Sequence, residues 1–222
     1  SINKIAVIDH HRRAADYIEN AVVSLHEPYA SSASELVSEL LQYLVPTSSI
    51  LTAEAEAMLA GVYLDTKGFS TRTGVRTFEA AAFLRRNGAD VTRVRKLFRE
   101  NAAEYKAKAD AVSQAEIYRN AYAISICHSE GIASPTVVGA QAANELLDIR
   151  GVKASFVLTE YQNKLFFSAR SIDEVNVQVI MERMGGGGHL NMAGCQLETV
   201  DLEGARSLLK STLTEMQDGG EI

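Results

Sequence analysis

The chain has 222 residues, of which 46% are hydrophobic and 23% charged, a composition typical of a globular protein with one large or two small domains. Its formal net charge of -6 argues against a protein that binds long nucleic acid through an overall positive charge, although a local basic patch could still bind a small anion. The two cysteines, Cys127 and Cys195, are far apart, which argues against a disulfide framework or a thiolate zinc site. We expect no membrane contact by this chain, because no apolar run approaches the roughly 20 residues that a membrane span needs.

The N-terminal region opens on a predicted strand that ends in ionisable residues. Ile5–Ile8 is a short apolar run, typical of a buried parallel strand, and Asp9, His10 and His11 follow it. A second strand is predicted over Ala21–Leu25. Open α/β sheets place their chemistry at the carboxyl ends of parallel strands, so this end of the sheet is a candidate site. Because the sequence begins directly on a strand, we expect an excised part of a longer protein.

Helices are predicted for most of the remaining first hundred residues. Ser32 and Glu35 have the spacing of a capping box for a helix that ends before Pro46. Thr52 is predicted to cap an apolar helix that runs to Asp65. Two more helices are predicted over residues 78–87 and 91–98, the second with a solvated basic face. A helix over residues 101–115, rich in Ala, Lys and Glu, is predicted to be an exposed linker between two lobes.

The second half of the sequence alternates strand and helix signals. In chain order, we predict a half-buried strand, a helix that begins at Ser134 and Pro135, and a hairpin. A helix that runs into Met184, a strand and an Asp201-capped helix follow. The strands and hairpin arms are Ala121–Cys127, Lys153–Thr159, Lys164–Ala169 and Ala193–Val200. The pattern predicts an α/β protein whose second lobe has a mixed sheet. We predict a first domain over residues 1–100, the linking helix over 101–115 and a second domain over 116–222.

Four residues of the first lobe are candidate metal ligands: Asp9, His10, His11 and Asp65. Carboxylate oxygen and imidazole nitrogen together suit Mn²⁺, Fe²⁺ or Zn²⁺ better than Ca²⁺. A pair of such ions can activate water and neutralise a phosphoryl group. From spacing alone, two adjacent histidines on a loop are more often surface residues, and Asp65 by itself is compatible with a solvated carboxylate or a helix cap.

The glycine run Gly185–Gly188 is the second candidate site. Successive glycine N–H groups can turn toward one anion, and His189, which follows at once, can donate to a phosphate oxygen. The alternative is a flexible linker. The candidate cationic phosphate contacts, for each of which plain surface charge is the alternative, are Arg12, Arg13, Lys67 and Arg170. His26 and His128 are interpreted as structural or exposed.

Three stretches of the sequence resemble a known family. I-A-V-I-D-H-H-R-R and G-V-Y-L-D-T-K-G-F are similar to the signature and fourth motifs of the DHH phosphoesterase superfamily. F-S-A-R-S, followed by a helix and G-G-G-G-H-L-N-M-A-G, resembles its substrate-binding DHHA1 domain. The residues of these motifs are most similar to those of the GdpP-type cyclic-di-AMP phosphodiesterases. That resemblance implies a manganese-dependent hydrolysis of cyclic di-AMP to linear pApA by metal-activated water.

The resemblance also implies roles for individual residues. His10 matches a metal ligand, Asp65 a bridging or shared ligand, and Asp9 and His11 residues that shape the catalytic site. The residues that match the phosphate-holding loop and its surroundings are Gly186, Gly187, Gly188, His189, Arg170 and Ser168. Two Mn²⁺ ions are implied in the intact enzyme.

The sequence departs from the family pattern before Asp9. The family's first two motifs, with one histidine and three aspartates, lie upstream of D-H-H, where this sequence has only eight residues. We therefore expect a truncated DHH lobe, a parallel sheet with helices, that is inactive or nearly so by itself. The alternatives are an oligoribonuclease or pAp phosphatase of the same superfamily, or a non-catalytic nucleotide-binding module. The expected partners are cyclic di-AMP or a short linear dinucleotide and a second copy in a homodimer, with the chain a cytoplasmic domain of a membrane-attached parent.

Overall fold

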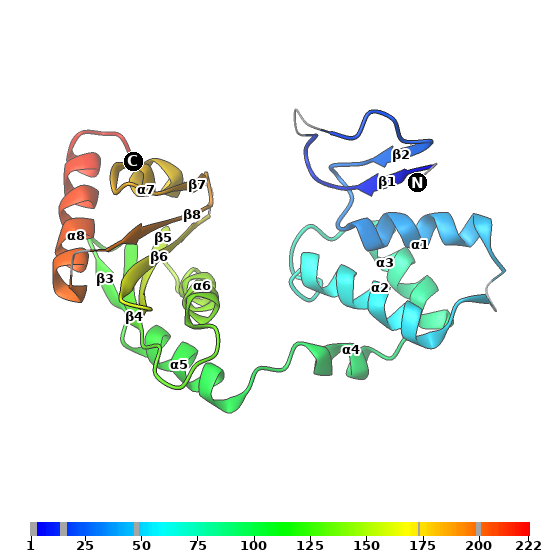
Figure 1. Cartoon of the computed structure of the whole chain (residues 1–222), viewed down its shortest axis with the longest axis horizontal. Coiled ribbons are helices and arrows are strands. Elements are labelled where there is room, and N and C mark those ends of the chain that lie inside the picture. Colours follow the sequence, from blue (N-terminus) through cyan, green and yellow to red (C-terminus); the bar gives the residue numbers. More distant parts are fainter. Residues whose placement is uncertain (1–3, 14–16, 47–48, 173, 199–200) are drawn as a thin grey trace. The chain divides into compact units, whose positions relative to one another are not determined.

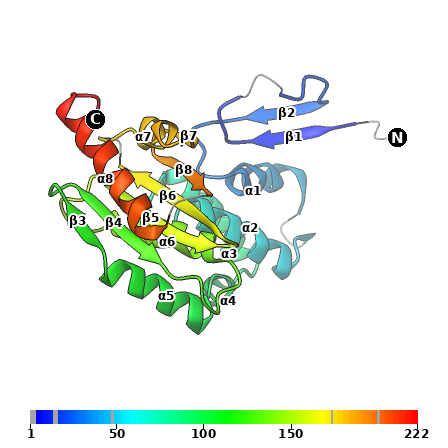
Figure 2. The same ribbon diagram turned by 60° about the vertical axis from the view of Figure 1, so that its left-hand side comes forward.

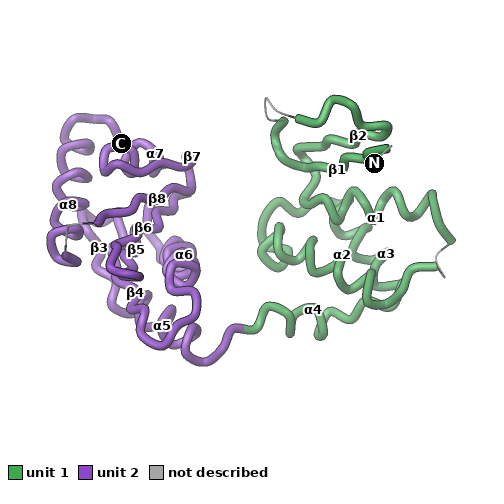
Figure 3. Tube along the Cα trace, in the orientation of Figure 1, with its two compact units in different colours: residues 1–99 green, residues 100–222 purple. Residues whose placement is uncertain are grey.

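Figure 1 shows the computed structural model, in which residues 4–13, 17–46, 49–172, 174–198 and 201–222 are described. The chain divides into two compact units, Ser1–Arg99 and Glu100–Ile222, which are coloured separately in Figure 3. Each unit combines helices with its own β-sheet. The predicted α/β fold, with a small parallel sheet and then a mixed sheet, is confirmed.

The first unit contains a pair of parallel strands followed by helices. Its elements are β1 (Ala6–Asp9), β2 (Val23–His26), α1 (Ala33–Leu44), α2 (Thr52–Asp65), α3 (Val75–Arg86) and α4 (Val91–Leu97). The two strands run in register from Ala6 opposite Val23 to Asp9 opposite His26. The parallel pairing confirms that both strands present their carboxyl ends at one edge.

An apolar cluster of α2, α3 and α4 forms the core of the first unit. Leu59, Leu84 and Val94 are buried there. No described residue of β1 or β2 belongs to this cluster, although α1 packs against β1. The strand pair is therefore held mainly by contacts outside the apolar core.

Two predicted helix starts are corrected by the structure. The Glu35 N–H donates to Ser32 Oγ at 3.0 Å, but the Glu35 carboxylate accepts from Ser31 Oγ at 2.5 Å, so only half of the expected capping box forms. Thr52 is the first helical residue rather than the cap. Leu51 stands at the cap position, and its N–H donates to Glu54 Oε2 at 2.9 Å.

The second unit is built on a six-stranded sheet with the strand order β3-β4-β5-β6-β8-β7. Its elements are α5 (Ala102–Ser113), β3 (Glu116–Tyr118), β4 (Tyr122–Cys127), α6 (Pro135–Leu146), β5 (Ala154–Tyr161), β6 (Lys164–Ser171), α7 (Val177–Arg183), β7 (Gly187–His189), β8 (Met192–Leu197) and α8 (Leu202–Asp218). The strands β4 and β5 are parallel and the other neighbours antiparallel. Strands β3 and β7 were not predicted, and residues 199 and 200 of the predicted last strand lie outside the described residues.

Helices cover both faces of this sheet (Figure 2). On one face, Phe156 and Phe167 pack with α7 and α8, and on the other, Ala123 and Val157 pack with α5 and α6. The prediction of a half-buried strand at residues 121–127 was therefore wrong. Most of β4 is buried, because both of its faces are covered.

Helix α5 is largely exposed, as we predicted, but it is not a separate linker between the two units. It lies within the second compact unit and packs on β4 and α6. Ala111 is 1% exposed, and its carbonyl accepts a hydrogen bond from Ser125 Oγ on β4. The small alanine side chains let the helix backbone approach the sheet closely. Among the described residues, no helix is both long and apolar enough to cross a membrane.

Candidate functional site

The first candidate site lies at the carboxyl ends of β1 and β2. Asp9 and His26 are the last residues of these strands and stand opposite each other in the parallel register. His10 and His11 follow β1 directly, and Asp65 is the last residue of α2. The sequence-predicted residues Asp9, His10, His11 and Asp65 are thus brought together, and His26 joins them.

Asp9 is held as a carboxylate acceptor. Its Oδ1 accepts from the His11 backbone N–H at 3.0 Å and lies 2.8 Å from His11 Nδ1. Its Oδ2 lies 3.8 Å from His26 Nδ1. The His11 backbone hydrogen bond is the largest cause that lowers the Asp9 pKa below its usual value. Asp9 is therefore ionised at neutral pH and orients His11, while His26 lies within ion-pair distance of it.

His10 faces the end of helix α2. Its Nε2 lies 3.5 Å from Asp65 Oδ2, and its side chain is 9% exposed against 37% for Asp65. His10 Nδ1 and His26 Nε2 are buried and have no hydrogen-bond partner among the described residues. Buried polar nitrogens are nearly always paired, so these two atoms are positions at which a water molecule, a ligand or an ion could bind.

The donor set gives a partial fit to a metal. Neutral imidazole and carboxylate are the ligand types that Mn²⁺ accepts, and the contact between His10 and Asp65 brings one of each together. However, the described residues contain no group of three or more His, Cys, Asp or Glu side chains that could hold an ion. Two ligands of this chain could contribute to a metal site, and further ligands would have to come from elsewhere.

The second candidate site is arranged by strand register in the second unit. Arg170 on β6 pairs with Met192, which pairs with His189 on β7. Ser168 pairs in the same way with Gly194, and Gly194 with Gly187. Because side chains alternate between the faces of a sheet, Ser168, Arg170, Gly187 and His189 share one face. It is the face covered by α6, since Ser155, opposite Arg170, donates its hydroxyl to Ala143 O on that helix.

The glycine run divides into two pairs with different environments. A Cβ at Gly186 would lie 2.2 Å from Gly194 O, and one at Gly188 would lie 2.4 Å from Ala193 Cα. At Gly185 and Gly187 a Cβ would meet nothing within 4 Å. Gly187 and Gly188 therefore belong to a paired edge strand, and Gly186 packs against β8, so the run is not the alternative flexible linker. Close packing against β8 explains why glycine is needed at Gly186 and Gly188. At Gly187, the lack of a side chain leaves the backbone open on the face that carries Arg170.

Arg170 is a partly buried cation that makes no ion pair with a carboxylate among the described residues. Its Nη1 donates to Ala169 O at 2.8 Å, and its Nε is buried with no partner among the described residues. Burial lowers the pKa of Arg170 below its usual value, but a guanidinium remains protonated at neutral pH. A buried guanidinium with a free N–H suits an anion such as a phosphate oxygen.

The other predicted phosphate contacts lie on the surface. Arg12, Arg13 and Lys67 are exposed, and the Arg13 guanidinium stands 4.5 Å from the centre of the Tyr17 ring. Two cavities, of about 310 and 590 Å³, are lined by residues outside both candidate sites. They lie beside the β5–β6 turn and between α1 and α3.

Sequence reasoning missed His26. We interpreted it as structural or exposed, but it is 16% exposed and faces Asp9. The available signal was its place at the end of the second predicted strand, because parallel neighbours bring their final residues together. His128 is exposed, which is one of the two outcomes that we predicted for it.

Models of known protein families match residues in both units. Residues 1–62 match the family model described as DHH family, N-terminal domain, and residues 120–215 match the DHHA1 domain. A cyclic-di-AMP phosphodiesterase GdpP of Geobacillus thermodenitrificans is 44% identical over 98% of this chain, and a cyclic-di-AMP phosphodiesterase PdeA of Listeria monocytogenes is 42% identical over 96%. The chain covers 33% and 32% of these relatives, about a third of their length.

One solved structure shares the fold over most of the chain. It is an exopolyphosphatase-related protein from Bacteroides fragilis, with a TM-score of 0.79 and 23% identity, over 95% of this chain and 63% of that one. At this identity the likeness concerns the fold alone.

Proposed function

This chain belongs to the DHH phosphoesterase superfamily and carries a DHHA1 domain, and on that premise we propose that it is part of a phosphodiesterase that opens cyclic di-AMP to linear pApA. The observation that carries the proposal is a pair of buried imidazole nitrogens, without a partner in the described part of the chain, beside carboxylates at the ends of two parallel strands. The similarity to curated cyclic-di-AMP phosphodiesterases supports the choice of substrate.

The first unit would supply part of the reaction centre. His10 and Asp65 would hold manganese, which when bound stabilises charge on the phosphoryl group and activates water. Asp9, held ionised by the His11 N–H, would fix the two histidines that face it. His11 itself has a side chain that is 77% exposed and could donate to a phosphate oxygen.

The second unit would bind the substrate phosphate. The Arg170 guanidinium, the Ser168 hydroxyl and the His189 imidazole lie on one sheet face and can all donate to phosphate oxygens. Gly187 keeps the backbone accessible between them. Gly186 and Gly188 would contribute indirectly, by letting β7 lie close to β8. Such fixed donors orient a substrate without a rearrangement at the moment of reaction.

Because the described residues contribute two of the ligands that an ion needs, we propose that this chain alone turns over little or no substrate. We propose that the parent protein is a larger cytoplasmic enzyme attached to a membrane and that its ligand is a short dinucleotide. Light scattering would measure whether the chain forms a homodimer. Robust cleavage of cyclic di-AMP by the purified chain with manganese would contradict the proposal that further ligands are required.

Calorimetric titration with pApA and with cyclic di-AMP, with and without manganese, tests substrate binding directly. We expect binding without added metal, weakened about tenfold in His189→Ala because one hydrogen bond to a charged group is lost. His128→Ala removes an exposed histidine of the same unit and serves as the matched control. The absence of binding under all conditions, or equal weakening by both substitutions, would contradict the assignment of the phosphate to β7.

A non-catalytic nucleotide-binding module is the second candidate function. It is favoured by the incomplete ligand set among the described residues. Nucleotide binding without any turnover after the chain is placed in the longer protein would support it. Within the superfamily, the relative rates of that longer protein on pApA and cyclic di-AMP distinguish an oligoribonuclease or pAp phosphatase from a cyclic-dinucleotide enzyme.

A further inference from the structure

The strand pair of the first unit is tied to its helices by polar links. The described apolar clusters contain no residue of β1 or β2, as noted above. One link is the contact of His10 with Asp65 at the end of α2. A second link joins Glu27, the residue after β2, to Arg76 on α3. This second link lies outside the set of residues that the proposed function uses.

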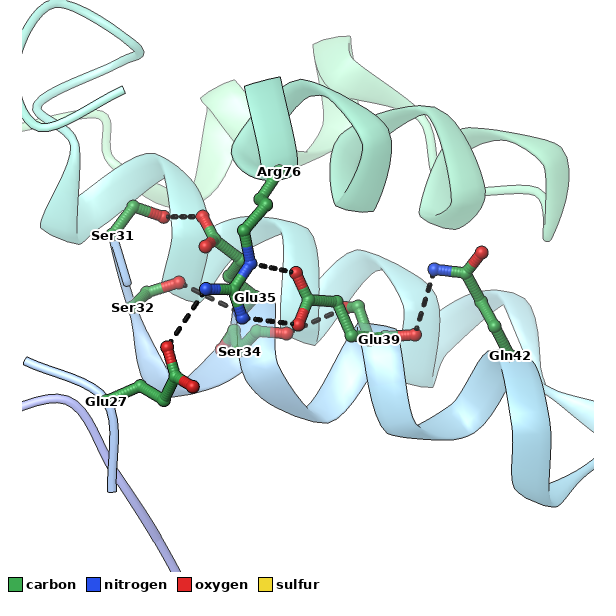
Figure 4. A network of polar contacts seen from close by, with 9 residues as sticks. Glu27, Ser31, Ser32, Ser34, Glu35, Glu39, Gln42 and Arg76 are labelled. Carbon is green, nitrogen blue, oxygen red and sulfur yellow. Dashed lines mark hydrogen bonds and ion pairs between the residues drawn. The ribbon is translucent and has the colours of Figure 1, made fainter. Parts of the chain in front are cut away.

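Arg76 engages two carboxylates at once (Figure 4). Its Nε and Nη2 donate to the two oxygens of Glu39 on α1, each at 2.7 Å. Its Nη1 donates to Glu27 Oε2 at 3.0 Å. The hydrogen bonds that Arg76 donates to the carboxylates of Glu39 and then Glu27 raise the pKa of Arg76 above its already high usual value. The bidentate pair fixes the guanidinium on α1 and leaves its third edge directed at Glu27.

Glu27 connects Arg76 to the histidine–carboxylate site at the ends of β1 and β2. Its N–H donates to Asp9 O at 2.9 Å, which extends the β1–β2 pairing by one residue. His26 immediately precedes it, with Nδ1 3.8 Å from Asp9 Oδ2 and Nε2 buried. A shift of Glu27 therefore moves the backbone that carries His26.

We propose that Arg76 is a positioning residue, which holds the end of β2 so that His26 stays against Asp9. Three donors in one rigid plane are needed, because two are occupied by Glu39 while the third reaches Glu27. The bearing of this placement on phosphodiester cleavage rests on the proposed function, whereas the placement itself does not.

The exposure of the three side chains separates positioning from stabilisation. Arg76, Glu27 and Glu39 are 45%, 40% and 28% exposed. Ion pairs at such exposure add little to the stability of a fold, since water screens them. Loss of Arg76 should accordingly change the local geometry of His26 more than the unfolding temperature.

The test follows the imidazole ¹⁵N and ¹H signals of His26 in the whole chain. In Arg76→Gln we expect them to move toward the signals of the exposed His128, with little change in thermal midpoint. The matched control is Arg93→Gln, which removes an ion pair of 2.8 Å to Glu56, joining α4 to α2 in the same unit. Unchanged His26 signals in Arg76→Gln, or an equal change in Arg93→Gln, would overturn the proposal.

Two further variants keep the test independent of a folding defect in Arg76→Gln. Glu27→Ala should move the His26 signals in the same way, and the double variant should add nothing, because both changes break one link. Additive shifts would refute a shared link. Arg76→Lys keeps the charge but cannot reach both carboxylates with a planar fork, so we expect it not to restore the parent signals. Full restoration would show that charge alone suffices and would overturn the role of the fork.

Discussion

Replacement of Gly188 by alanine tests the interpretation of the glycine run as a packed edge strand. Gly188 has φ of +150°, a backbone conformation that residues with a Cβ rarely adopt. An added Cβ would lie 2.4 Å from Ala193 Cα and 2.5 Å from Met192 O. Both are atoms of β8, which cannot rotate away as a flexible side chain would.

Two costs add at this position. The glycine-only conformation costs an L-residue about 1–3 kcal/mol. Forcing β7 and β8 apart adds about 1–3 kcal/mol, as overpacking does in a dense core. Local detachment of the three-residue strand β7 limits the total, so we expect a loss of about 2–4 kcal/mol in the free energy of unfolding.

Denaturant unfolding followed by circular dichroism, with hydrogen exchange of the β7–β8 amides, measures this loss. Gly187→Ala is the matched control, because its Cβ would meet nothing within 4 Å. We expect that variant to remain within about 0.5 kcal/mol of the parent. If the two variants unfolded at the same denaturant concentration and exchanged their β7–β8 amides equally fast, the packing explanation of Gly188 would be refuted.

Two further predictions follow from pKa shifts. Burial raises the pKa of the Cys195 thiol to about 11 from 9.0, so at pH 8 we expect its alkylation to be about 100-fold slower than that of a free thiol. Mass spectrometry of iodoacetamide-treated protein measures this rate. A rate equal to that of free cysteine would contradict the prediction. Lys210 and then Arg206 lower the pKa of Glu116. The stabilisation that Glu116 provides, at most about 1 kcal/mol at its exposure, is thus present above its unfolded pKa of 4.5 and lost as pH falls through the lower folded value. Glu116→Gln should abolish this pH dependence in denaturant titrations between about pH 3 and pH 7, a range that includes the unfolded pKa of 4.5.

Much of the candidate site follows from contiguous residues. Asp9, His10 and His11 stand at a strand end that the apolar run Ile5–Ile8 predicts, and Asp65 ends a helix that the sequence also predicts. The roles of these residues in metal or phosphate binding stay predictions. His26 could not be assigned in the same way, because its contact with Asp9 depends on the pairing of two segments that are separate in the sequence.

The sequence by itself determined the local features of this protein. Pro135 starts α6, the Asp201 carboxylate caps α8 through the Gly204 N–H at 2.7 Å, and Gln162 and Asn163 form the tight turn of the predicted hairpin. These signals lie in neighbouring residues, since caps and turns are local hydrogen-bond and backbone preferences.

Only the tertiary structure decided which distant residues meet. It packs α5 on β4, sets Gly188 against β8 and places Arg170 and His189 on one sheet face through their shared register with Met192. It also joins Arg76 to Glu27 across 49 positions of the sequence. Such contacts depend on strand register and on the close approach of separate elements, and a shift of one residue in register would reverse every face.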